Sequence, residues 1–143
     1  MRKYIYIGIG GALGATIRYS LKVSPVLNSE EIHSNSLIIN YILSLPLYTL
    51  IANISGCFLL AAVLSAFAEI PEFDPDVKPG ITVGFLGAYT TLSTLCKETL
   101  ELFYSGSFLH AVLYLLISIL PGLAAAWAGS AAGSRTGAKL FSR

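Results

Sequence analysis

The stretch Gly84–Glu98 reads GFLGAYTTLSTLCKE, a segment broken by glycine and rich in hydroxyl groups within an apolar chain. Four hydroxyl residues fall within five positions: Thr90, Thr91, Ser93 and Thr94. Buried hydroxyl groups are costly unless they find hydrogen-bond partners. Irregular backbone at membrane depth is tolerated only where protein covers it or where it lines a cavity. The pattern therefore predicts a polar site on an interrupted membrane helix.

The composition around this stretch predicts an integral membrane protein. Of the 143 residues, 55% are hydrophobic and 12% are charged, and the mean hydropathy is +0.71. Soluble domains carry about 25% charged residues. Segments 34–68, 79–96 and 105–134 contain no Asp, Glu, Lys or Arg, and about 20 apolar residues are enough to span the hydrocarbon core. A soluble all-helical protein is the less favoured alternative. The net charge of +1 gives no indication of a nucleic-acid partner.

We expect an all-α fold, with one domain over residues 1–143 and four transmembrane helices. The expected spans are about 4–22, 47–68, 79–103 and 108–129, and the third is interrupted near Gly87–Thr91. Residues 24–46 are expected to form a connector, in which the apolar stretch Leu37–Leu45 either lies at the membrane interface or extends the next helix.

The basic residues predict an orientation for these spans. Four spans place both termini on one side, where six of the nine Lys and Arg residues then lie. Because positive charge favours the cytoplasmic side, we expect both termini to be inside. Arg2 and Lys3 precede an apolar run as in a signal peptide, but no small-residue cleavage site follows, so we interpret this run as a helix.

Small residues at helical spacing predict where helices approach one another closely. Gly10 and Gly14 lie four residues apart in the first helix, and Ala125, Gly129 and Gly133 repeat this spacing in the last helix. Residues without bulky side chains let two membrane helices pack backbone to backbone.

Polar side chains also follow helix faces. Thr49 and Asn53 lie one turn apart in the second span, and Tyr114 and Ser118, with His110 one turn before them, repeat this spacing in the fourth. Asn53 has two interpretations: an interhelical hydrogen bond, often worth about 0.6 kcal/mol, or a place in the wall of a pore. For the amide taken alone, the first interpretation is favoured.

These groups suit small ions better than catalysis. Neutral N–H and O–H groups can donate hydrogen bonds to an anion that must also leave again, and the carbonyls of a broken helix suit a small cation. The sequence shows no nucleophile–base pair and no carboxylate dyad, so we do not expect an enzyme. Cys57 and Cys96 have no Cys or His neighbours and are expected to be free thiols.

Three motifs resemble those of the Fluc/CrcB family of fluoride channels: GGALGATIRY (Gly10–Tyr19), TLIANISGCF (Thr49–Phe58) and GFLGAYTTLSTLCKE (Gly84–Glu98). The resemblance implies a multi-pass protein of the cell membrane (the plasma or inner membrane) that exports cytoplasmic fluoride. It also implies an antiparallel, dual-topology-like dimer of four-helix subunits with pores along the interface and a structural Na⁺ at the dimer centre.

The resemblance further implies roles for individual residues, carried over by motif. The pore positions are Asn53, Thr49, Tyr114, Ser118, Leu92 and Leu95. The carbonyls of Gly87 and Thr90 would hold Na⁺, while Arg18 matches the arginine of the first helix and Glu98 the acidic residue that closes the third motif, expected at a helix edge.

One departure from the family pattern bears on conduction. The family usually reads TTFSTF, and its two phenylalanines aim their ring edges at fluoride, whereas this chain has Leu92 and Leu95. Aromatic edges carry partial positive charge and alkyl groups do not, so part of the anion coordination is missing unless Tyr89 or Phe58 replaces it. We therefore expect one member of a heterodimer with a second Fluc-type subunit, weakly active or inactive alone, with a homodimer left open.

Two other functions are weighed against this one. A non-conducting structural or assembly subunit of the same family is compatible with the two leucines. A small four-helix multidrug exporter needs a carboxylate embedded in the membrane, and the first helix contains no Asp or Glu. For the channel, Asn53→Ala is expected to lower fluoride flux without lowering expression.

Overall fold

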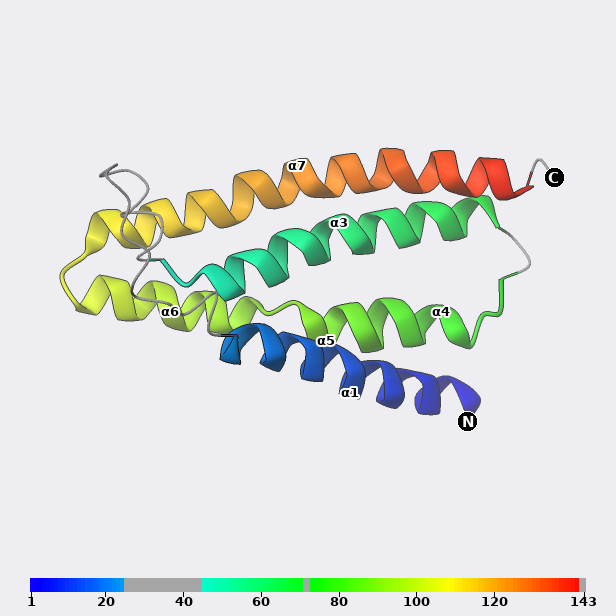
Figure 1. Cartoon of the computed structure of the whole chain (residues 1–143), viewed down its shortest axis with the longest axis horizontal. Helices are drawn as coiled ribbons and strands as arrows, with labels where there is room; N and C mark the ends of the chain where they lie inside the picture. Colours follow the sequence, from blue (N-terminus) through cyan, green and yellow to red (C-terminus); the bar gives the residue numbers. More distant parts are fainter. Residues whose placement is uncertain (25–44, 71–72, 142–143) are drawn as a thin grey trace.

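The described part of the chain is a bundle of four helical rods. The computed structural model describes residues 1–24, 45–70 and 73–141, with the backbone alone for 140–141. Helices make up all of its regular secondary structure, as Figure 1 shows. The predicted connector at 24–46, with its apolar stretch Leu37–Leu45, lies almost entirely outside the described residues.

The helices follow one another as α1 (Arg2–Val23), α3 (Leu47–Glu69), α4 (Val77–Pro79), the π-helix η1 (Gly80–Leu86), α5 (Gly87–Tyr89), α6 (Leu92–Tyr104) and α7 (Phe108–Phe141). The segments α4, η1 and α5 are continuous and form the third rod together with α6. Thr90 and Thr91 separate α5 from α6. The prediction of four helices with an interrupted third helix is confirmed.

The rods are close to the expected spans, with one difference. The fourth rod, α7, continues to Phe141, beyond the expected end at residue 129. Two helices in the described residues are long and apolar enough to cross a membrane, α3 and the part of α7 over Phe108–Lys139. The rod α1, which has basic residues near both ends, and the divided third rod are not among them. Both ends of the chain lie at the same end of the bundle (Figure 1).

The rods pack in two pairs. The helix α3 lies mainly against α7, and α1 lies mainly against η1. Both contacts occur at glycines, whose lack of a side chain lets the two backbones touch. A Cβ atom added at Gly14 would meet the carbonyl oxygen of Phe85, and one added at Gly133 would meet that of Ala62. The predicted small-residue contacts are therefore confirmed: in both pairs two backbones touch.

A small apolar core joins the two pairs at the end of the bundle where α6 turns into α7. Leu45, Leu50, Leu95 and Tyr114 form this cluster and are all buried. The turn between α6 and α7 contains Gly106, whose φ of 79° places it in the left-handed region that favours glycine. This turn lets α7 return alongside α6, which brings Tyr114 to the polar residues described next.

Candidate functional site

The break in the third rod is built by two extended residues. Thr90 has ψ 157°, and Thr91 has φ −151° and ψ 112°. Thr91 is the N-cap of α6, because its Oγ1 accepts a hydrogen bond from the backbone N–H of Thr94 at 3.2 Å. The hydroxyl groups of Thr91 and Thr94 also lie 2.9 Å apart. The hydroxyl-rich sequence thus restarts the helix after the break.

Asn53 bridges this break from the neighbouring helix α3. Its Nδ2 donates to the carbonyl oxygen of Thr91 at 3.0 Å, and the N–H of Thr91 donates to its Oδ1 at 2.8 Å. The carboxamide thereby satisfies both backbone polar groups at the middle of the break. The interhelical hydrogen bond considered for Asn53 is present, and its partner is the backbone of the broken helix.

Because of the hydrogen bonds at Thr91 and Thr94, two backbone carbonyl oxygens lack the N–H donors that they would have in a continuous helix. In a continuous α-helix the carbonyl of Gly87 accepts from the N–H of Thr91, and that of Thr90 from the N–H of Thr94. Both of these N–H groups donate to side-chain oxygens instead. The two residues predicted to hold a cation are therefore among those whose carbonyls lose their usual helical donors at the break.

The described residues supply only some of the oxygen ligands that a cation at the break would need. They contain no group of three or more His, Cys, Asp or Glu residues that could hold a metal ion, so carbonyl oxygens would have to supply the ligands. Gly87 is exposed and Thr90 is half-buried. Because carbonyls must replace the hydration shell of the ion, two of them from one chain need further oxygens from elsewhere.

A buried carboxylate lies just beyond the break. Glu98 is 6% exposed and lies within α6, so its expected place at a helix edge is wrong. Its Oε2 accepts from the hydroxyl of Tyr114 at 2.6 Å, and its Oε1 accepts from Thr49 at 3.1 Å and from Tyr48. Three hydroxyl donors compensate for the loss of water around this group. In the described residues the only ion pair is Lys97–Glu101, on the exposed side of α6.

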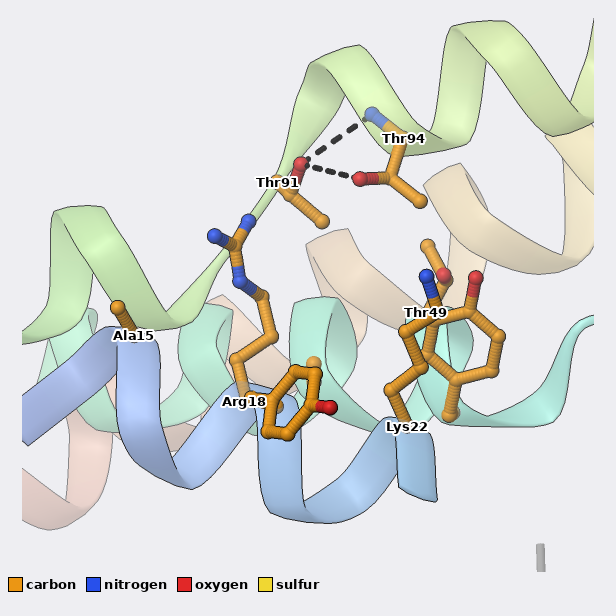
Figure 2. Close-up of a pocket in the computed structure, with 9 residues that line it drawn as sticks. Ala15, Arg18, Lys22, Thr49, Thr91 and Thr94 are labelled. Atoms are coloured by element: carbon orange, nitrogen blue, oxygen red, sulfur yellow. Dashed lines mark hydrogen bonds between the residues drawn. The ribbon is translucent and has the colours of Figure 1, made fainter.

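Two basic side chains face a cavity beside this carboxylate. The cavity, here called the basic pocket, has a volume of about 420 Å³. It is lined by Ala15, Arg18, Tyr19, Lys22, Tyr48, Thr49, Ala52, Thr91 and Thr94. In Figure 2 Arg18 extends from α1 toward Thr91, and Lys22 extends toward Thr49. A cavity with basic side chains in its wall attracts anions.

A second cavity, here called the amide pocket, lies on the other side of Asn53. Its volume is about 390 Å³, and α3, the break, α6 and α7 form its walls. The predicted pore residues in its wall are Asn53, Leu92, Leu95 and Ser118, and Thr90, which was predicted to hold Na⁺, also lines it. Thr91 lines both pockets. The two pockets therefore adjoin at Thr91, and Asn53, which is bonded to Thr91, lines the amide pocket.

The two leucines in this wall differ in their surroundings. Leu92 is 73% exposed, while Leu95 is 7% exposed and belongs to the apolar core. The aromatic residues considered as substitutes for ring edges do not line the amide pocket. The hydroxyl of Tyr89 lies 2.8 Å from that of Ser55, and Phe58 lines a separate apolar groove.

The predicted stripe on α7 faces the same region. Tyr114 is fully buried and Ser118 nearly so, and the Ser118 hydroxyl donates to the Tyr114 carbonyl at 2.7 Å. His110, one turn earlier, is half-buried. The spacing of four correctly placed Tyr114 and Ser118 on one face. It did not indicate that Tyr48 belongs to the site, because a single tyrosine before Thr49 matches no motif.

Together these features define a class of protein: a small, multi-helix membrane protein with a broken helix. Neutral hydrogen-bond donors line two pockets at the break, and basic side chains from α1 line one of them. Residues 5–130 match the family described as CrcB-like protein, Camphor Resistance (CrcB). The chain belongs to this family.

Curated relatives cover nearly the whole chain. Fluoride-specific ion channel FluC 2 of Geobacillus kaustophilus (strain HTA426) is 38% identical over 129 residues, which are 90% of this chain and 91% of the relative. Fluoride-specific ion channel FluC 1 of Bacillus anthracis is 42% identical over 86% of this chain and 82% of its own length. Fluoride-specific ion channel FluC of Thermosipho melanesiensis is 41% identical over 92% and 95%.

Proposed function

We propose that this chain is a subunit of a fluoride-selective channel that exports fluoride from the cytoplasm across the cell membrane. The relatives that match it over most of their length are named as ion channels specific for fluoride. The structural observation that carries the proposal is that Thr91, held by Asn53, lines both pockets. A small anion that passes the break would leave the basic pocket and enter the amide pocket at this point.

The side chains that line the basic pocket and the amide pocket suit the passage of an anion rather than its tight binding. Arg18 and Lys22 raise the local concentration of anions at the basic pocket. Beyond them the wall offers hydroxyl and amide groups, which donate hydrogen bonds without a full charge. Conduction requires sites strong enough to replace water and weak enough to release the ion. No step of this passage needs an acid, a base or a nucleophile, so the proposed function is not that of an enzyme.

A second Fluc-type subunit completes the proposed assembly. The carbonyl-bearing residue Gly87 and the pocket residue Leu92 are both exposed in the single chain. An antiparallel partner with the same face would cover them and add the same two carbonyls. The carbonyls of Gly87 and Thr90 from both subunits would then hold a structural Na⁺, whose charge would join the subunits at their centre.

The leucines favour a heterodimer in this proposal. Leu92 and Leu95 provide no aromatic edge in the amide pocket, and neither Tyr89 nor Phe58 lines it. A partner that carries aromatic residues at these positions would supply the missing edges in a shared assembly. For the same reason, the second candidate function is a non-conducting structural subunit of this family.

Fluoride efflux from liposomes tests the proposal. We expect slow or no efflux from liposomes that contain this chain alone, and rapid efflux once the chain is reconstituted with a second Fluc-type subunit from the same organism. Chloride efflux from the same liposomes should stay at the level of empty ones. Rapid efflux from the lone chain would exclude the need for a different partner. Absence of efflux with any partner, together with no rescue of a fluoride-sensitive strain, would favour the non-conducting subunit.

A further inference from the structure

Tyr48 connects the basic pocket to the buried carboxylate, although it belongs to none of the three motifs. It lies in the first turn of α3, is half-buried and lines the basic pocket with Arg18 and Lys22. Its hydroxyl donates a hydrogen bond to Oε1 of Glu98. One side of this tyrosine is thus open to the pocket while its hydroxyl is bonded to a carboxylate.

The hydrogen bonds at Glu98 make the Tyr48 hydroxyl the most replaceable of the three donors. Among the described residues, Oε2 has one side-chain donor, Tyr114 at 2.6 Å, whereas Oε1 has two, Tyr48 and Thr49. Thr49 is fully buried and lies 3.1 Å from Oε1. The large cost of a buried acceptor arises when no donor remains. If the Tyr48 hydroxyl turned away, Thr49 would still satisfy Oε1.

An anion in the basic pocket would compete for this hydroxyl. Arg18 and Lys22 line the same cavity, so an anion held near them lies in the space that Tyr48 borders. A hydroxyl group donates one hydrogen bond and carries no charge. Fluoride has the highest charge density among the halides and gains the most from such a donor.

We propose that Tyr48 is a specificity-determining donor: its hydroxyl turns from Glu98 to a small anion in the basic pocket and so selects fluoride before it reaches the break. This inference rests on the proposed function, because it assigns a residue to the capture of the anion that the channel is proposed to conduct. Arg18 and Lys22 attract any anion, and Tyr48 distinguishes the smallest one.

The test compares a tyrosine of the basic pocket with one that lines neither pocket. Tyr48→Phe removes the hydroxyl and keeps the ring. Tyr104→Phe makes the same change at the last residue of α6, which is 82% exposed. Titration calorimetry with sodium fluoride and with sodium chloride on the purified full-length chain measures binding. Fluoride efflux from liposomes with the partner subunit measures the concentration for half-maximal flux and the maximal flux separately.

We expect Tyr48→Phe to weaken fluoride binding about fivefold, the factor that corresponds to about 1 kcal/mol, because the bond that the hydroxyl forms with the anion is partly offset by the bond that it gives up at Glu98. The half-maximal concentration should rise by the same factor while the maximal flux stays nearly constant. Chloride binding, and every value for Tyr104→Phe, should stay unchanged.

The outcomes separate this inference from the proposed function. Fluoride binding that depends on Tyr48 without any efflux would overturn the channel and leave the donor in place. Efflux with equal binding and equal half-maximal concentrations in Tyr48→Phe and the native chain would overturn the donor and leave the channel in place. A purified native chain that binds no fluoride, or an equal loss of fluoride and chloride binding in Tyr48→Phe, would also overturn the donor.

Discussion

The carboxamide of Asn53 forms two hydrogen bonds with the backbone of Thr91, one to its carbonyl oxygen at 3.0 Å and one from its N–H at 2.8 Å. The two residues are 38 positions apart in the chain. One side chain on an intact helix therefore fixes the middle of a broken helix. This relationship links the stability of the fold to the geometry of the proposed pathway.

Asn53→Ala should lower both fluoride flux and stability. The substitution removes the partners of two polar backbone groups, and an unsatisfied buried group costs about 1–3 kcal/mol. We expect a net loss of about 1–3 kcal/mol, because water in the adjoining pockets can satisfy part of the break. The expression level, expected from the sequence to stay constant, should fall with the loss of stability. Thermal unfolding in detergent and fluoride efflux measure the two effects.

Ser118→Ala is the matched control for this substitution. Ser118 lines the amide pocket with Asn53, but its hydroxyl donates to the carbonyl oxygen of Tyr114 one turn earlier in α7 and does not reach the break. Its removal should change the free energy of unfolding by less than about 1 kcal/mol. An unfolding temperature for Asn53→Ala equal to that of Ser118→Ala would show that the bridge to Thr91 does not stabilise the break.

Glu98→Gln should destabilise the chain, since three hydroxyl groups donate to this carboxylate. An amide offers one acceptor oxygen and turns the other position into a donor. One or two of the hydroxyls of Tyr48, Thr49 and Tyr114 would then face an N–H₂ group. We expect a loss of about 1–3 kcal/mol of unfolding free energy, measured by thermal or denaturant unfolding in detergent.

The same change at Glu101 provides the comparison. Glu101 lies on the same helix, and its side chain is 61% exposed and paired with Lys97 at 3.2 Å. Exposed ion pairs contribute about 0–1 kcal/mol, so Glu101→Gln should leave the unfolding temperature nearly unchanged. Equal effects of the two substitutions would mean that the hydroxyl donors do not stabilise the Glu98 carboxylate.

Gly14→Ala and Gly8→Ala should have opposite effects, although both lie on α1. A Cβ atom at Gly14 meets the carbonyl oxygen of Phe85, whereas one at Gly8 meets no atom within 4 Å. Alanine favours a helix over glycine by about 1 kcal/mol, so Gly8→Ala should be neutral or stabilising. Gly14→Ala must push α1 away from η1 and should cost more than this gain. Unfolding temperatures in detergent check the sign, and a stabilising Gly14→Ala would contradict the backbone contact.

The sequence predicted the parts of this structure that depend on helix periodicity. Spacings of three and four residues place side chains on one helix face wherever the helix packs. For this reason the small-residue stripe with Gly129 and Gly133, and the polar pair of Tyr114 and Ser118, lie as expected. The break near Thr91 was also predictable, because glycine and hydroxyl residues interrupt an uncharged run there.

The parts that depend on contacts distant in sequence were not predictable in this way. Glu98 lies between Lys97 and Thr99 along the chain, and the turn at Gly106 brings Tyr114 back to its buried carboxylate. Tyr48 joins the site because α3 and α6 cross there. The π-helix Gly80–Leu86 has no periodic signature of its own, since seven residues are too few to distinguish its period from that of an α-helix.

Leu92→Phe and Leu95→Phe should separate anion coordination from packing, because the two leucines line one pocket with different exposure. Leu92 is 73% exposed in the single chain, so a larger ring fits there without moving other residues of the same subunit, and its edge offers partial positive charge to an anion. Leu92→Phe should therefore raise fluoride efflux with little change in unfolding temperature. Leu95 is 7% exposed within the apolar core, and overpacking such a position costs about 1–3 kcal/mol.

Leu92→Met and Leu95→Met are the controls, since methionine adds length without an aromatic edge and fits apolar sites with little cost. Efflux measured beside the unfolding temperature for all four variants distinguishes the two effects. Equal efflux for Leu92→Phe and Leu92→Met would show that ring edges are not what this subunit lacks. If Leu95→Phe instead raised efflux without loss of stability, the core around Tyr114 would have room for a second ring, and both leucines would count as missing parts of the anion site.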